Sequence, residues 1–154
     1  MLLEIEKRVD IGVAPELSWA LLRDIPQLTQ CIPRVTALEE IAPDQRYATT
    51  ISDKIGPFRV TIPVQIEIQA IEPPRRIVAA ISGHDAKGQA RLKGSLEAVV
   101  DSVGISTQLL VLMRLDVLGK LASLGAAPMR RRADQIFDEF IACVSARLTD
   151  PTTH

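Results

Sequence analysis

Side chains that could carry out acid–base chemistry are few in this sequence. His84 and Asp85 are neighbours in a predicted turn, and Tyr47 is the second residue of a predicted strand. An imidazole beside a carboxylate can move protons near neutral pH. Polar neighbours in a hairpin turn are, however, generally solvated. These three residues are the candidates for proton transfer, with a solvated turn as the alternative for His84 and Asp85.

Nucleophilic, metal and phosphate chemistry have no support in the residue spacing. Cys31 and Cys143 lie in apolar segments without a histidine nearby, and we predict that they are buried thiols in a reducing compartment. The sequence contains no HxxxH, CxxC, phosphate-loop or dinucleotide motif. We therefore predict no catalytic residue, metal ligand or cofactor.

A cationic triplet, Arg130-Arg131-Arg132, stands out in a chain whose formal net charge is -1. That balance argues against a general electrostatic attraction to nucleic acid. The triplet could touch anionic lipid headgroups transiently, and a solvated helix flank is the alternative. No signal peptide or membrane-spanning apolar run is visible. We expect a cytoplasmic protein with at most transient contact at the inner face of the membrane.

The element that must organise these residues is a long C-terminal helix. Its apolar residues recur on one helical face: Ile136, Phe137, Phe140, Ile141, Val144 and Leu148. A stripe this wide requires a large apolar partner. Upstream, Pro128 either kinks the helix after a first segment at 120–124 or begins a new one. In both cases the joint at 125–128 could act as a hinge.

The partner is predicted to be a sheet. Apolar and polar residues alternate most clearly from Phe58 to Ile68, where Pro63 marks an edge or a bulge. The predicted strands are 3–11, 35–41, 46–54, 58–68, 77–82, 90–100 and 105–117, with short helices at 14–24 and 27–32. Long antiparallel strands coil strongly, so about seven strands should wrap around the terminal helix.

This arrangement is an α+β helix-grip fold, and it resembles the START-like superfamily, which includes polyketide cyclases and lipid carriers. We expect a single domain over residues 1–149 and a short polar tail at 150–154. The chain also resembles the carbon monoxide dehydrogenase G-subunit family nearly end to end. The matching segments are VAPELSWALLRD at 13–24, Cys31-Ile32-Pro33, Ile55-Gly56-Pro57-Phe58, Glu72-Pro73-Pro74, the spaced Gly83, Asp85, Gly88 and Ala90, and GKLASLG at 119–125.

Two positions depart from that family's pattern. The family usually continues Cys-Ile-Pro with glycine, where this chain has Arg34, and Pro128 is unusual in the long helix. The resemblance implies carriage of an isoprenoid quinone or lipid, in the service of a molybdenum hydroxylase of the carbon monoxide dehydrogenase type at the membrane.

An apolar ligand would lie between sheet and helix. The chain is 47% hydrophobic but only 3% aromatic, and small Ala90, Gly94 and Ala98 are predicted to leave room there. A solid core is the alternative. The predicted ligand-binding residues are Tyr47, Phe58, Val60, Ile62, Val64, Leu92, Leu96, Leu109, Val111, Met113, Met129, Phe137, Phe140 and Ile141.

With so few ionisable groups at inward positions, we predict binding without catalysis. Two alternatives remain. One is a cyclase or dehydratase of the polyketide type that uses Tyr47, His84 or Asp85. The other is an assembly factor that docks an oxidoreductase without a ligand. Leu110 and Leu112, opposite the predicted cavity, suggest a homodimer contact.

Overall fold

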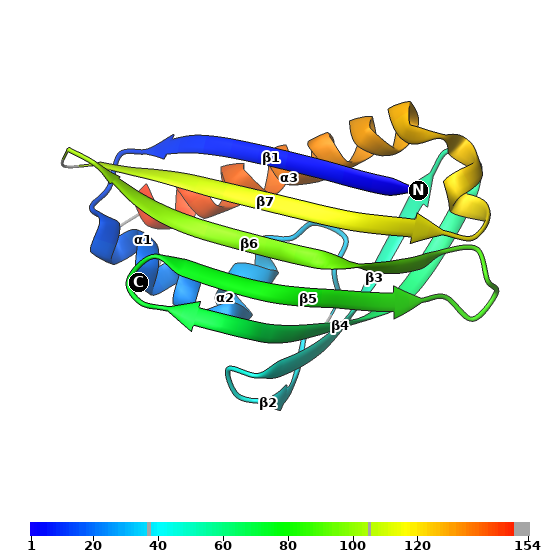
Figure 1. Cartoon of the computed structure of the whole chain (residues 1–154), viewed down its shortest axis with the longest axis horizontal. Coiled ribbons are helices and arrows are strands. Elements are labelled where there is room, and N and C mark those ends of the chain that lie inside the picture. The colour runs from blue at the N-terminus through cyan, green and yellow to red at the C-terminus, as the bar shows by residue number, and fades with distance from the viewer. Residues whose placement is uncertain (37, 105, 150–154) are drawn as a thin grey trace.

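The computed structural model of the chain describes residues 1–36, 38–104 and 106–149. Within them, a seven-stranded antiparallel sheet has the order β1-β7-β6-β5-β4-β3-β2 (Figure 1). The strands are β1 (Leu2–Ile11), β2 (Glu39–Ala42), β3 (Arg46–Ile55), β4 (Phe58–Glu72), β5 (Arg76–His84), β6 (Arg91–Val103) and β7 (Ser106–Leu118). The helices are α1 (Pro15–Arg23), α2 (Ile25–Gln30), the 3-10 helix η1 (Lys120–Leu124) and α3 (Ala126–Thr149). The predicted tail at 150–154 lies outside the described residues.

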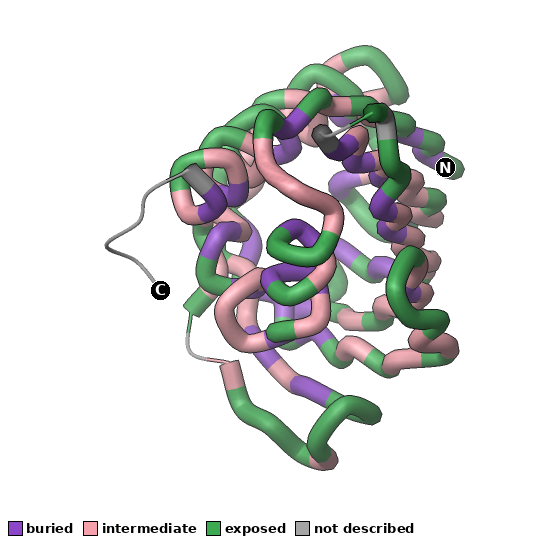
Figure 2. The backbone as a smooth tube through the Cα atoms, turned by 90° about the vertical axis from the view of Figure 1, so that its left-hand side faces the viewer, coloured by how far each residue is buried: buried purple, intermediate pink, exposed green. Residues whose placement is uncertain are grey.

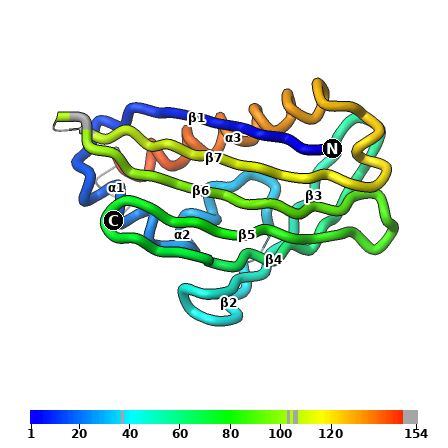
Figure 3. The backbone as a smooth tube through the Cα atoms, in the orientation of Figure 1, coloured from blue at the N-terminus to red at the C-terminus, as the bar shows by residue number. Residues whose placement is uncertain are grey.

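The helices cover one face of the sheet, and buried residues gather between the two layers (Figure 2). The long helix α3 runs beside β1, while α1 lies against β6 and β7 (Figure 3). β1 and β2 are the two sheet edges, so the coiled sheet does not close into a barrel. This confirms the helix-grip fold, with α1 sharing the concave face with α3.

Buried and exposed residues alternate along β4, because one face of the strand packs in the core and the other faces solvent. Val60, Ile62 and Val64 are buried, whereas the intervening residues are exposed. Pairing of β4 with β5 starts at Val64, so the strand end that contains Pro63 pairs only with β3. Pro63 therefore marks an edge, as a residue without an N–H donor should. The bulge lies further along, between Ile68 and Ala70.

The segment before β2 departs from the predicted strand at 35–41. The strand is confined to Glu39–Ala42, and Val35 makes only an isolated bridge to Ile51. Thr36 explains the irregularity, because it donates its N–H to Thr50 O at 2.9 Å and accepts the Thr49 hydroxyl at 2.6 Å. A side-chain bond of this kind competes with a regular ladder.

The second helix begins earlier than the predicted 27–32. Asp24 caps it by accepting the Gln27 N–H at 3.2 Å, and Pro26 occupies the first turn, where no N–H donor is needed. Pro128 has the same role in α3, which begins at Ala126. Gly125, at a φ of 82°, separates α3 from η1. Pro128 therefore lies in a new helix start rather than at a kink.

The prediction of two free thiols is wrong. Cys31, at the C-terminal end of α2, forms a disulfide with Cys143 of α3, and their Cα atoms are 5.4 Å apart. The residues are 112 positions apart in the chain, so only the packing of α2 on α3 brings them together. An apolar sequence context is the same for a buried thiol and for a buried disulfide, which is why the pattern misled.

Candidate functional site

An apolar hollow lies between the sheet, the two short helices and the C-terminal half of α3. Its volume is about 30 Å³. The short helices contribute Ser18, Leu21, Leu22 and Leu28, the strands contribute Ile11, Leu96, Ala98, Leu109 and Val111, and α3 contributes Phe140, Val144 and Leu148. We call this space the inner cavity.

The wall of the inner cavity is apolar in composition. Ser18 is its one polar side chain, and the Ser18 hydroxyl donates to Ala14 O at 3.3 Å. A 30 Å³ space admits water-sized molecules but is far smaller than the roughly 300–1,000 Å³ of common ligand pockets. The inner cavity therefore offers dispersion contacts without an ionisable group, and it has to widen before it can hold a larger molecule.

Only some of the predicted ligand-binding residues lie on this wall: Leu96, Leu109, Val111 and Phe140. Tyr47, Met113 and Phe137 pack in the same hydrophobic cluster without lining the cavity. A second cluster, toward the start of α3, contains Phe58, Val60, Ile62, Val64, Leu92 and Met129. Ile141 is half-buried on α3.

The sequence reasoning missed the wall that α1 and α2 provide. It placed the ligand between sheet and α3, whereas α1 packs against β6 and β7 at the same face. The signal that could have revealed this wall was the presence of apolar Leu21, Leu22 and Leu28 in the two predicted short helices, because these side chains also need an apolar partner. The expectation of room at Gly94 is also wrong, because a Cβ at Gly94 would clash with Arg114 O of β7. That glycine permits close approach of two strands.

The acid–base candidates are engaged elsewhere. The Asp85 carboxylate accepts the Ala90 N–H at 3.0 Å, and the Asp85 N–H donates to Ala90 O at 3.1 Å, so Asp85 holds the β5–β6 turn. His84 is exposed at the end of β5. The Tyr47 hydroxyl accepts the Asp44 N–H at 3.0 Å. None of these three side chains lines the inner cavity.

The comparison with known protein families gives a match over residues 8–149, to CoxG, the G subunit of carbon monoxide dehydrogenase. The chain belongs to this family. The comparison with curated proteins found no match. The family assignment therefore rests on nearly the whole chain and confirms the resemblance drawn from its motifs.

Solved structures with this fold include proteins of several descriptions. A conserved protein from Geobacillus kaustophilus has a TM-score of 0.85 at 21% identity, over 95% of each chain. A START superfamily protein from Mycobacterium smegmatis has a TM-score of 0.70 at 15% identity, over 94% of this chain and 96% of that one. The Zhui aromatase/cyclase from Streptomyces sp. R1128 has a TM-score of 0.61 at 14% identity, over 99% and 98%. At such identities the likeness shows the fold alone.

The departure of this CoxG family member at Arg34 has a structural basis. Arg34 has a φ of 64°, in the left-handed region that favours the glycine usual in the family. The Arg34 side chain compensates by pairing with Glu139 of α3 at 2.8 Å and with Asp53 of β3 at 3.3 Å. The arginine therefore ties the loop after α2 to both layers.

Asp53 is the centre of that network. Its side chain is only 4% exposed, and it accepts two hydrogen bonds from Arg132, at 3.0 and 2.5 Å. The hydrogen bond to Asp53 is the main cause that raises the pKa of Arg132. A buried carboxylate needs such pairing, so the Asp53 network holds α3 against β3.

The arginine triplet does not point in a single direction. Arg130 donates to Glu4 O of β1 at 3.1 Å, while Arg132 is bound to Asp53 on the other side of the helix. Arg131 is exposed and lines a surface hollow together with Lys54. Arg130 and Arg131 remain the exposed cations of the triplet.

Groups of three or more histidine, cysteine or acidic residues that could hold a metal ion are absent from the described part of the chain. None of the described helices combines the length and apolar character needed to span a bilayer.

Proposed function

We propose that the chain binds an apolar small molecule in a widened form of the inner cavity and carries it without transforming it. The observation that carries this proposal is the composition of the wall, where eleven of the twelve lining residues are apolar and Ser18 is bonded to the backbone. Such a wall binds by excluding water and by dispersion. It has no ionisable side chain that could act as a general acid or base in a reaction.

Membership of the CoxG family supports an isoprenoid quinone or a lipid as the ligand, and a molybdenum hydroxylase of the carbon monoxide dehydrogenase type as the oxidoreductase served. The long, flexible tail of such a ligand would replace side-chain contacts between α1 and α3 as the two separate. Leu110 and Leu112, half-buried on the outer face of β7, stay our candidates for a contact with a second copy.

We further propose that loading takes place at an anionic membrane surface. Each cation near such a surface contributes about 1 kcal/mol, and Arg130 and Arg131 are both exposed near the start of α3. Two such charges support only a weak attachment that salt disrupts. That suits a carrier that must leave the membrane with its ligand.

The cyclase alternative is less well supported. It would need Tyr47, His84 or Asp85 to reach a substrate, and none of them lines the inner cavity. Turnover of a cyclisable polyketide by the purified chain would nevertheless decide for this alternative.

Native mass spectrometry of protein purified without detergent tests the proposal. We expect a co-purifying quinone or lipid on the wild type and little on Ala98→Leu, because the added side chain fills the inner cavity. Val99→Leu is the matched control, since Val99 is half-buried on the same strand and does not line the cavity. Equal ligand occupancy in all three proteins would place the ligand elsewhere.

A further inference from the structure

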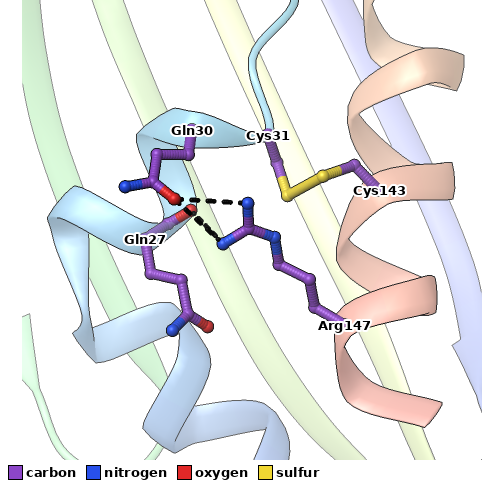
Figure 4. Close-up of a disulfide and its surroundings, with 5 residues drawn as sticks. All are labelled: Gln27, Gln30, Cys31, Cys143 and Arg147. Carbon is purple, nitrogen blue, oxygen red and sulfur yellow. Dashed lines mark hydrogen bonds between the residues drawn. A yellow bond between two sulfur atoms is a disulfide. The ribbon is translucent and has the colours of Figure 1, made fainter. Parts of the chain in front are cut away.

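Three residues on one stripe of α3 fasten the segment that follows α1. Glu139, Cys143 and Arg147 are spaced four apart, so they lie one above the other on the helix. Glu139 pairs with Arg34, and Cys143 is bonded to Cys31. Arg147 donates to the Gln27 carbonyl and to the Gln30 side chain (Figure 4). We call these three connections the latch.

The latch joins two walls of the inner cavity. Leu28 of α2 lines the cavity three residues before Cys31, and the wall continues into Leu21 and Leu22 of α1. Phe140 and Val144 line it from α3, on either side of Cys143. Because the cavity is only about 30 Å³, a larger ligand requires its walls to separate. The latch opposes that separation directly.

The three connections differ greatly in strength. Glu139 has a side chain that is 52% exposed, so its ion pair with Arg34 is screened by water. The Arg147 hydrogen bonds are long, at 3.4 Å to Gln27 O and 3.3 Å to Gln30 Oε1. Only the disulfide is covalent. The redox state of Cys31 and Cys143 therefore decides whether the latch can open.

We infer that the Cys31–Cys143 disulfide is a redox latch on the inner cavity, which a dithiol reductant opens for ligand exchange and oxidation closes. This inference rests on the proposed ligand-binding function and adds its regulation. The ligand is retained while the walls are joined, and it is exchanged once α2 can move away from α3.

Opening is a thiol–disulfide exchange with a dithiol, such as that of a reducing oxidoreductase. A thiolate of the reductant attacks the Sγ of Cys143, which is half-buried, whereas Cys31 is buried. The sulfur–sulfur bond breaks, and Cys31 leaves as a thiolate that takes up a proton. The second thiol of the reductant then resolves the mixed disulfide and releases Cys143. The reductant becomes a disulfide, and the protein gains two thiols.

The test compares oxidised and dithiothreitol-reduced wild type. The probe is the neutral dye N-phenyl-1-naphthylamine, whose fluorescence rises in an apolar site, and stopped-flow mixing gives its association rate. Alkylation with iodoacetamide, read by mass, establishes the thiol state in each sample. We expect the dye to enter the reduced protein at least tenfold faster.

The double variant Cys31→Ala/Cys143→Ala is the matched control. It should bind dye at the fast rate with or without dithiothreitol, which separates opening of the latch from other effects of the reductant. Hydrogen exchange of the wild type adds a reading that needs no variant. Reduction should deprotect the amides of 15–31 and leave those of β6 unchanged.

Three results would overturn the inference. Equal entry rates in the oxidised and reduced wild type would refute the latch and leave ligand binding standing. Absence of dye binding in both states would refute the latch and the proposed function together. Alkylation of both cysteines in protein treated with an oxidant, without reductant, would show that the disulfide does not form.

Discussion

Phe140 offers a direct measure of how the inner cavity is built. Its ring lines the cavity from α3 and is half-buried. Phe140→Ala removes the ring and leaves a benzene-sized hollow beside the existing 30 Å³. The combined space is of the order of the roughly 150 Å³ apolar cavity that stays dry and binds benzene in a well-studied engineered protein.

The expected cost follows from that geometry. Truncation of a fully buried phenylalanine costs about 3–5 kcal/mol. Because Phe140 is only half-buried, we expect about 2–3 kcal/mol. For a chain of this length, that lowers Tm by about 5–10 °C. Benzene at ten times its Kd should return about 1.4 kcal/mol, or about 3–6 °C.

Thermal unfolding with and without benzene is the assay. Phe58→Ala is the matched control, since Phe58 is also half-buried but packs in the other hydrophobic cluster. It should lose stability without gaining a benzene response. If benzene raised the Tm of both variants equally, or if Phe140→Ala melted like the wild type, the inner cavity would not have the walls described here.

Three further outcomes are expected. His84→Ala should leave the affinity for N-phenyl-1-naphthylamine within a few-fold, about 1 kcal/mol, and a loss by orders of magnitude in a fluorescence titration would contradict this. Compared with the wild type, the double variant Arg130→Gln/Arg131→Gln should take up dye from anionic vesicles more slowly at low salt but not at high salt. If the variant and the wild type had the same transfer rate at both salt concentrations, these arginines would belong to a solvated helix flank. Arg23 lowers the pKa of Asp44 through a hydrogen bond at 2.7 Å. The stabilisation that Asp44 contributes is therefore fully present above the ordinary aspartate pKa of 3.8. It is lost as the pH falls through the lower pKa that Asp44 has in the folded protein. The difference in denaturant midpoint between wild type and Asp44→Asn should therefore shrink in acid, and a difference that grew there would reverse the sign of this coupling.

Much of the fold could be predicted because each strand carries its own signal. The alternation from Phe58 to Ile68 and the stripe from Ile136 to Leu148 are local patterns that burial on one face imposes. β2 was the exception, since Thr36 and Thr49 divert the backbone with side-chain hydrogen bonds. Such competition is not visible in a pattern of apolar residues.

The site was harder to predict because it depends on contacts between distant elements. The alternation of apolar and polar residues along each strand identified inward residues such as Val60 and Val111. It could not show which of them α1 would cover. The Cys31–Cys143 bond spans 112 residues and leaves no local trace. Arg34 was visible as a departure from the family, yet its ion pairs with Asp53 and Glu139 required the structure.

The pairing of β1 with β7 also constrains how the chain can fold. Leu3 pairs with Leu115, and Ile5 pairs with Met113, whereas the strands from β3 to β7 pair in sequence order. The hairpins can form early and locally, but the first strand has no partner until the last one exists. At a synthesis rate of about 5–20 residues per second, β1 waits roughly 5–20 s on the ribosome with its apolar side chains uncovered. We therefore expect closure of this long-range ladder to be slower than formation of the hairpins, because its two strands are far apart in the sequence.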